Sequence, residues 1–123
     1  MDFKIELVPL PVADVDRAKG FYVDKVGWAA DFDTTVHEGL RFVQITPPGS
    51  ACSVCFGEGL DMLPEGSSQF IQVVVADADA ALAYLKDRGV ACDGVQELAW
   101  GRFVTFADPD GNRWALQQLP PRG

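Results

Sequence analysis

The sequence predicts a single α+β domain built from two similar βαβββ modules. Two observations predict this fold class. A segment near the N-terminus recurs 63 positions later in the same register. Each copy is followed by short runs rich in β-branched and aromatic residues, which turn sequences separate from one another. The length of 123 residues fits one domain.

The repeat is most visible around the two predicted helices. Residues 12–25 read VADVDRAKGFYVDK, and residues 75–88 read VADADAALAYLKDR. Chance does not readily produce so many matches in one register, so we interpret the repeat as a supersecondary unit copied once. The positions identical between the copies are, in the first copy, Val12, Ala13, Asp14, Asp16, Ala18 and Asp24.

The first module is predicted to cover residues 1–57. A strand is expected at residues 4–10, followed by a helix that Asp14 caps and that ends before Gly27. Three further strands are expected at residues 28–36, 40–46 and 51–57. The apolar positions expected on one face of the helix are Val15, Ala18, Tyr22 and Val26.

The second module repeats this order after a linker predicted at residues 58–67. It covers residues 68–123 and begins with a strand at residues 69–76. A helix follows, capped by Asp77 and ending before Gly89. The remaining strands are expected at residues 94–98, 102–107 and 112–118.

The composition excludes several classes of partner. A formal net charge of −8 argues against nucleic acid and anionic membrane, and it mildly favours a cationic partner besides serving solubility. Neither a signal peptide nor a membrane-spanning run is expected, because the N-terminal residues lack a basic region and no long apolar stretch occurs. Three cysteines do not indicate a secreted disulfide framework, so we expect a cytoplasmic protein with reduced thiols.

Three stretches carry a resemblance to a known family. They are VADVDRAKGFYVDKVGW, VADADAALAYLKDRGV and, near the C-terminus, FADPDGNRWALQQL. Together they resemble the vicinal oxygen chelate superfamily, which includes glyoxalase I, extradiol dioxygenases, fosfomycin-resistance enzymes and bleomycin-binding proteins. The resemblance covers nearly the whole chain and implies two curved half-sheets that form a cleft, often across a homodimer. It implies the fold more strongly than any activity.

The resemblance also implies where metal ligands would stand. The family's metalloenzymes place His, Gln or Glu seven residues before each helix-opening Asp, and Leu7 and Phe70 occupy those positions here. A third ligand position falls on Ala115, and the fourth lies between Ser53 and Cys55. Leu, Phe and Ala supply no donor atoms, so we expect no metal site of the family type and no cofactor.

Strand alternation assigns neighbours to these positions on the predicted cleft face. Gln72, Gln117 and Arg113 share that face, which is therefore mostly apolar with a few polar groups, as in a small-molecule pocket. Five aromatic residues are close enough in the topology to add stacking surfaces, although core packing is an equally open role for them: Trp28, Phe32, Phe42, Phe56 and Trp100. The candidate ligand-binding set is Leu7, Trp28, Phe32, Phe70, Gln72, Trp100, Arg113, Ala115 and Gln117.

Other motifs indicate structural roles. His37 reads as a hairpin residue. Cys52 and Cys55 are three residues apart, so on a strand their side chains would point to opposite faces rather than share a metal or redox site. The Asp108-Pro109-Asp110-Gly111 segment is typical of a tight turn. No catalytic residue is assigned.

Three functions are compatible with these features. The preferred hypothesis is a metal-free binding protein of the bleomycin-resistance type, which sequesters an aromatic or cationic small molecule in an apolar cleft. The alternative is a metalloenzyme of the glyoxalase/dioxygenase family (a lyase, isomerase or dioxygenase) with a displaced metal site. The third is a structural or regulatory module whose cleft is filled by its own side chains.

Overall fold

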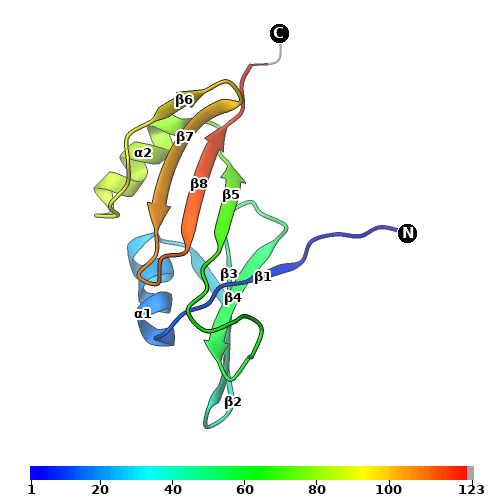
Figure 1. The fold of residues 1–123 in the computed structure, drawn as a ribbon. Coiled ribbons are helices and arrows are strands. Elements are labelled where there is room, and N and C mark those ends of the chain that lie inside the picture. The colour runs from blue at the N-terminus through cyan, green and yellow to red at the C-terminus, as the bar shows by residue number, and fades with distance from the viewer. Residues whose placement is uncertain (122–123) are drawn as a thin grey trace. The chain divides into compact units, whose positions relative to one another are not determined.

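The structure is a computed structural model that describes residues 1–121, and the chain divides into two compact units between Ser68 and Gln69. Each unit contains one four-stranded sheet with a helix packed on one face only (Figure 1). The division falls one residue beyond the segment that the sequence predicts as a linker. Both units have the βαβββ order, so the predicted α+β fold class is confirmed.

Unit 1 comprises residues 1–68. Its elements are β1 (Leu7–Pro9), α1 (Val15–Lys19), the π-helical turn η1 (Gly20–Lys25), β2 (Ala29–His37), β3 (Leu40–Thr46) and β4 (Ser53–Glu58). The sheet has the strand order β1-β4-β3-β2. β1 runs parallel to β4, whereas the other neighbouring pairs are antiparallel.

Unit 2 begins at Gln69 and repeats the same arrangement. Its elements are β5 (Phe70–Val74), α2 (Ala78–Asp87), β6 (Gln96–Leu98), β7 (Gly101–Ala107) and β8 (Arg113–Gln118). The strand order is β5-β8-β7-β6, with β5 parallel to β8. Within residues 1–121, no helix is long and apolar enough to cross a membrane.

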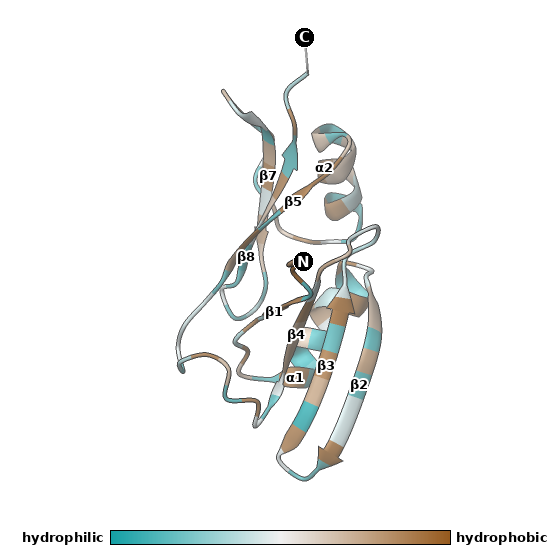
Figure 2. Cartoon of the chain, turned by 90° about the vertical axis from the view of Figure 1, so that its right-hand side faces the viewer, coloured by the Kyte–Doolittle hydropathy of each residue, from teal (hydrophilic) through white to brown (hydrophobic). Residues whose placement is uncertain are grey.

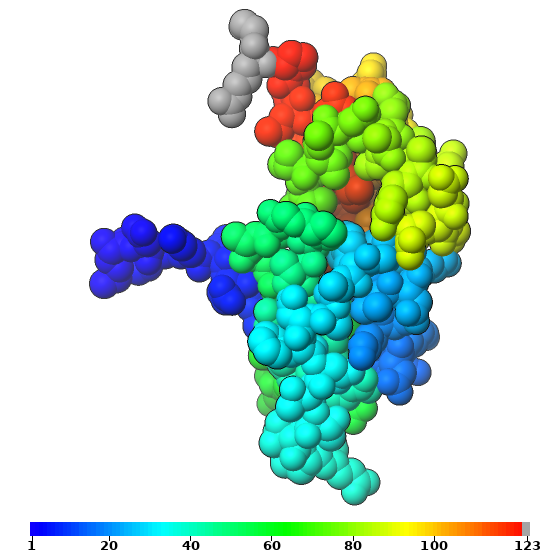
Figure 3. Space-filling view, turned by 180° about the vertical axis from the view of Figure 1, so that it is seen from behind, coloured from blue at the N-terminus to red at the C-terminus, as the bar shows by residue number. Residues whose placement is uncertain are grey.

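The first strand is shorter than predicted. The sequence predicts a strand at residues 4–10, but β1 covers only Leu7–Pro9. The register explains the difference, because Leu7 lies beside Ser53, the first residue of β4. Residues before Leu7 would have to pair with the turn that precedes β4, where Ser50 N donates to the carbonyl of Pro47. The N-terminal residues instead extend away from the rest of unit 1 (Figure 3).

The first helix also differs from the prediction of one regular α-helix. After α1 the chain continues as η1, in which Val26 N donates to the carbonyl of Phe21, five residues earlier. Ala18, Tyr22 and Val26 are all fully buried at spacings of four residues. A turn wider than the α-helix keeps side chains at this spacing on the face that packs on the sheet. The expected apolar face therefore forms.

The core of each unit lies between its helix and its sheet. Val43 and Ile45 of β3 are fully buried on the same side of the sheet as Arg41, which bonds to Asp16 of α1. Figure 2 shows the hydropathy of the residues along β3. In unit 2, the rings of Phe106 and Trp114 stack with their centroids 6.1 Å apart. Gly27 and Gly89 follow the helices with positive φ angles of 89° and 75°, which confirms the predicted C-terminal glycines.

Candidate functional site

The strand register of unit 2 brings the predicted polar and apolar site residues onto one side of the sheet. Gln118 and Arg102 point to the α2 side, since Gln118 Oε1 accepts from the N–H of Ala78 and Arg102 pairs with Asp79. Residues of the opposite parity form the other side, which we call the helix-free face of unit 2. It is lined by Phe70, Gln72, Val74, Phe103, Thr105, Arg113, Ala115 and Gln117.

Arg113 lies over the ring of Phe70 at one end of this face. The two residues are register partners on β5 and β8, and the guanidinium carbon is 5.9 Å from the ring centroid. This geometry is a cation–π contact. Within residues 1–121, the Arg113 side chain makes no ion pair, in contrast to Arg102, which is bonded to both Asp79 and Glu97.

Two glutamine side chains form a hydrogen-bonded chain across the middle of the face. Gln117 Nε2 donates to the backbone carbonyl of Trp100 at 2.7 Å. Gln72 Nε2 in turn donates to Gln117 Oε1, also at 2.7 Å. Gln117 is buried, whereas Gln72 is exposed. The Gln72 amide is therefore held in place by a buried partner that is itself anchored to the backbone.

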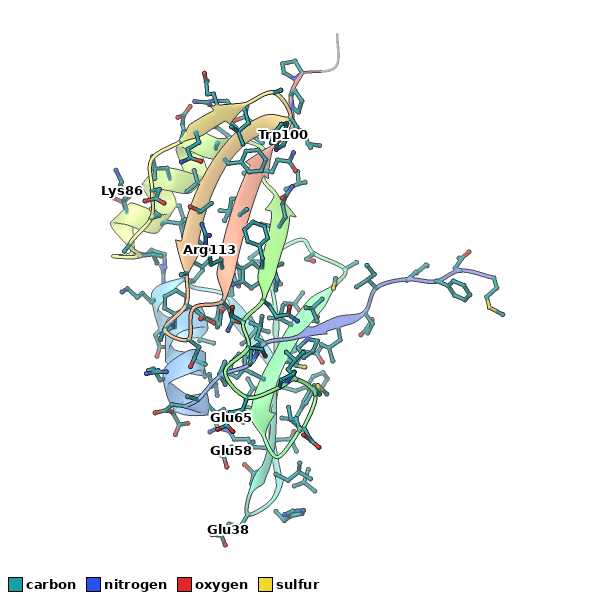
Figure 4. All side chains as sticks on the ribbon, in the orientation of Figure 1. Glu38, Glu58, Glu65, Lys86, Trp100 and Arg113 are labelled. Carbon is teal, nitrogen blue, oxygen red and sulfur yellow. The ribbon has the colours of Figure 1, made fainter. Side chains whose placement is uncertain are left out.

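Trp100 lies at the other end of the second sheet. It lies in the β6–β7 turn with 61% of its surface exposed. Arg113 and Trp100 lie toward opposite ends of the second sheet (Figure 4). The backbone at this end depends on Gly101, which has a φ of 146°. A Cβ at that position would lie 2.6 Å from the carbonyl oxygen of Gln118, so only glycine fits.

Unit 1 has a corresponding helix-free face, which carries two of the candidate residues. Leu7 pairs with Ser53 on one side of the sheet, and Phe32 pairs with Gln44 toward the other edge. Both point away from the side on which Arg41 of β3 bonds to Asp16 of α1.

The segment after β4 returns over this face. Cys55 of β4 lies on the same side as Ser53, and its Sγ is 4.0 Å from Met62 Sδ. Burial raises the pKa of the Cys55 thiol, which keeps it protonated and unreactive at neutral pH. Cys52 lies outside the strand, and its Sγ contacts the carbonyl of Ser53. The two cysteines therefore have separate surroundings.

Trp28 takes the packing role, one of the two roles that the sequence leaves open for it. Its ring stacks on Tyr22 with a centroid distance of 5.9 Å, and Tyr22 in turn packs against Phe56. Tyr22 is fully buried between the helix and the sheet. Trp28 is thus part of the packing on the helix side of unit 1, and it does not share a face with Leu7 and Phe32.

Two residues of the unit 2 face are absent from the sequence-based set. Phe103 and Thr105 lie on β7 beside Gln117 and Ala115. Thr105 Oγ1 donates to Asp93 Oδ2 at 3.3 Å. The apolar run Phe103-Val104 in β7 leaves the parity of this strand open in the sequence, and it becomes known only from the register with β8.

The side chains at the family's metal positions do not fit a divalent ion. Leu7, Phe70 and Ala115 offer hydrocarbon side chains. In the part of the chain that the structure describes, no group of three or more His, Cys, Asp or Glu side chains could hold a metal ion. Asp108 accepts from the backbone N–H groups of Asp110 and Asn112, so the predicted tight turn uses its carboxylate.

Comparison with known proteins places this arrangement among relatives. The family model described as Glyoxalase/Bleomycin resistance protein/Dioxygenase superfamily matches residues 4–116. The solved structure of TnmS3, an antibiotic binding protein from Streptomyces sp. CB03234, is similar with a TM-score of 0.82 and 35% identity, covering 97% of this chain and 98% of its own.

Two further relatives agree with this assignment. A glyoxalase/bleomycin resistance protein from the same Streptomyces strain has a TM-score of 0.78 and 36% identity, covering 94% of this chain and 100% of its own. The uncharacterised protein YetH of Bacillus subtilis strain 168 is 27% identical over 119 residues, which are 94% of this chain and 98% of YetH.

Proposed function

The chain belongs to the Glyoxalase/Bleomycin resistance protein/Dioxygenase superfamily, and on that premise we propose that it is a metal-free cytoplasmic protein that binds and sequesters an aromatic small molecule. The observation that carries the proposal is the combination on the helix-free face of unit 2. The apolar side chains of Phe70 and Ala115 occupy the family's metal positions there, and a guanidinium group and an anchored amide lie beside them. Such a surface binds through stacking and a few directed polar contacts.

The proposal uses the aromatic side chains as the main source of affinity. Phe70 and Trp100 are each more than half exposed in unit 2, and Phe32 is similarly exposed on the helix-free face of unit 1. Exposed aromatic rings gain stability by stacking on a planar ligand, because burial of their surface adds to the interaction between rings. That TnmS3 is an antibiotic binding protein supports the same role for this chain.

A titration of the purified protein tests the proposal. Neutral, cationic and anionic polycyclic compounds (fluorenone, acridine orange and a naphthoate) are titrated while tryptophan emission and heat of binding are followed. We expect saturable binding of at least one class. Phe70→Ala should weaken that binding about tenfold, which corresponds to the loss of one ring contact with its buried area.

A matched control comes from the opposite face of the same unit. Tyr84 is an exposed aromatic residue of α2, so Tyr84→Ala removes a ring without touching the helix-free face. It should leave the dissociation constant unchanged. Equal effects of the two substitutions, no binding by any compound, or a stoichiometric divalent ion in protein purified without chelator would each contradict the proposed function.

A further inference from the structure

The polar groups on the helix-free face of unit 2 specify the chemistry of the ligand beyond its being aromatic. Resting on the proposed function, we infer that the ligand carries an anionic oxygen, such as a carboxylate or an acidic phenol, that Arg113 binds. We infer further that it carries a hydroxyl or amino donor, which Gln72 binds on the other side of the ring. The cationic class of ligand, which the net charge of the chain favours, is then disfavoured at this face.

The charge of Arg113 is not neutralised by an ion pair within residues 1–121. Arg41 is bonded to Asp16 and Asp33, and Arg102 to Asp79 and Glu97, so these two guanidinium groups are already neutralised. Within residues 1–121 the Arg113 side chain makes no ion pair and no hydrogen bond, and its one ring contact is with Phe70. In a chain with a net charge of −8, a guanidinium without a carboxylate stands out as available to a ligand.

Covering such a group with a ligand has an energetic consequence. A guanidinium that loses water without gaining a counter-charge is destabilised, whereas a carboxylate accepts its paired N–H groups in a bidentate contact. Asp93, an acidic residue in contact with this face, is bonded to Thr105 of β7, which is separated from the Phe70 strand by β8. No carboxylate within residues 1–121 forms an ion pair with Arg113.

The two hydrogen bonds of Gln117 fix which amide group Gln72 presents to a ligand. The backbone oxygen of Trp100 can only accept a hydrogen bond, so the group of Gln117 that faces it must be the NH₂. The Oε1 of Gln117 then faces Gln72, which must present its own NH₂. Gln72 makes no other hydrogen bond within residues 1–121, so its exposed Oε1 is available as an acceptor, and a ligand that displaces water from it should supply a donor.

The strand register sets the distance between Arg113 and Gln72. Arg113 lies beside Phe70, and Gln72 is two residues further along β5. From the rise per residue and the distance between strands, the Cα atoms of Arg113 and Gln72 are about 8 Å apart. Ala115, the register partner of Gln72, lies between the two contacts and is buried with a small apolar side chain. A ring system with its anionic group and its donor at opposite ends matches this geometry.

Four related probes separate the two contacts. They are a naphthoate with a hydroxyl at the opposite end of the ring system, its methyl ether, its methyl ester, and the matching hydroxynaphthylmethylammonium cation. Isothermal titration calorimetry gives the Kd of each. We expect the hydroxynaphthoate to bind most tightly, with the ether and the ester each about tenfold weaker and the cation weaker still.

Substitutions assign each contact to a residue. Arg113→Gln should weaken hydroxynaphthoate about tenfold and abolish the preference for the acid over the ester. The control is Arg88→Gln at the end of α2, which removes the same charge and a similar cation–π contact, in this case with Tyr84. It should change neither the Kd of hydroxynaphthoate nor the preference for the acid over the ester. Gln72→Leu should abolish the preference for the hydroxyl over the ether while keeping the preference for the acid.

The outcomes distinguish this inference from the proposed function. If the cation or the ester binds as tightly as the acid, or if Arg113→Gln and Arg88→Gln behave alike, the anionic specificity is wrong while aromatic binding stands. If the ether equals the hydroxyl compound, the role of Gln72 is wrong. Failure of every probe, together with failure of the fluorenone and acridine orange titrations, would remove the proposed function itself.

Discussion

At the scale of single residues, the two modules use the same device to tie helix to sheet. Asp16 and Asp79 occupy equivalent positions of the repeat, and each is bonded to an arginine of a sheet strand, Arg41 in β3 and Arg102 in β7. In unit 1, Asp33 of β2 also takes part in this ion-pair cluster, because it accepts two hydrogen bonds from Arg41 and one from Lys19. The repeat in the sequence is therefore also a repeat of ion pairs.

The pH dependence of unit 1 should follow from Asp33. Its hydrogen bonds with Arg41 and then with Lys19 hold the pKa of this carboxyl well below its usual range. A carboxyl with a lower pKa in the folded state stabilises the protein above the unfolded pKa of about 3.9 and loses this contribution as the pH falls below that value. We expect Asp33→Asn to lower the free energy of unfolding by about 1 kcal/mol at neutral pH, because the group remains partly accessible to water.

Urea denaturation at pH 7, 4 and 3 checks this expectation. The difference between the native protein and the Asp33→Asn variant should shrink at each step toward low pH. Glu38→Gln, at the tip of the β2–β3 hairpin, removes one acidic charge without removing an ion pair and is the control (Figure 4). A difference that stays constant from pH 7 to 3 would show that Asp33 acts through packing instead of charge.

Gly101 packs closely against Gln118 and against Gln117, which is a residue of the candidate site. A Cβ there would lie 2.6 Å from the carbonyl oxygen of Gln118 and 3.3 Å from Gln117 Nε2. We expect Gly101→Ala to lower the free energy of unfolding by about 1 to 3 kcal/mol, since the backbone is strained and the Gln117 amide must move. Gly94→Ala is the control, because nothing lies within 4 Å of its added Cβ. Chemical denaturation compares them, and equal stabilities would contradict the close packing at Gly101.

At the scale of elements, the two helices begin alike but continue differently. Asp14 and Asp77 are N-caps with extended backbones, as the sequence predicts. Asp77 accepts from the N–H groups of Asp79 and Ala80, whereas Asp14 accepts from that of Arg17. α2 then runs for ten residues, while α1 gives way to η1 after five.

The caps should therefore contribute unequally to stability. We expect Asp77→Ala to cost about 1 kcal/mol and Asp14→Ala to cost less, because the first substitution removes the partner of two backbone donors and the second that of one. Thermal unfolding followed by circular dichroism measures both. Asp77→Asn keeps a side-chain acceptor and should cost only a few tenths of a kcal/mol. A larger loss in Asp14→Ala than in Asp77→Ala would contradict this ranking.

At the scale of the whole molecule, each sheet ends in strands that have a neighbour on one side only within residues 1–121. These edge strands include β1 and β5. Unpaired strand edges favour association with another chain. The helix-free faces add exposed aromatic side chains, and Phe3 and Ile5 are exposed in the N-terminal residues that extend from unit 1 (Figure 3). Exposed apolar groups of this kind mark surfaces for association.

We therefore predict that the chain forms a homodimer. Size-exclusion chromatography with light scattering should give about twice the chain mass of 13.3 kDa at micromolar concentration. Dilution should shift the mass toward that of one chain only well below that concentration. A mass of one chain over the whole range, with normal ligand binding, would show that unpaired edges are tolerated without a second copy.

The strand face of the candidate residues could be predicted from the sequence, whereas the contacts between their side chains could not. Strand alternation predicts that Phe70, Gln72, Arg113, Ala115 and Gln117 share a face, and the register has this arrangement. Alternation carries no information on which side chains touch. The bond from Gln117 to Trp100 joins residues 17 positions apart, and that from Gln72 to Gln117 joins residues 45 apart. Both depend on how three strands are aligned.

The sequence by itself determined the repeat, the order of strands and helices, the caps and the faces of β5 and β8, because all of these follow from local periodicity and turn residues. Only the tertiary structure decided that Trp28 packs on Tyr22, that Met62 returns to Cys55, and that the first helix widens into η1. It also decided that Arg113 faces a ring rather than a carboxylate. These contacts join segments whose distance in space depends on sheet register and packing, which local sequence preferences do not specify.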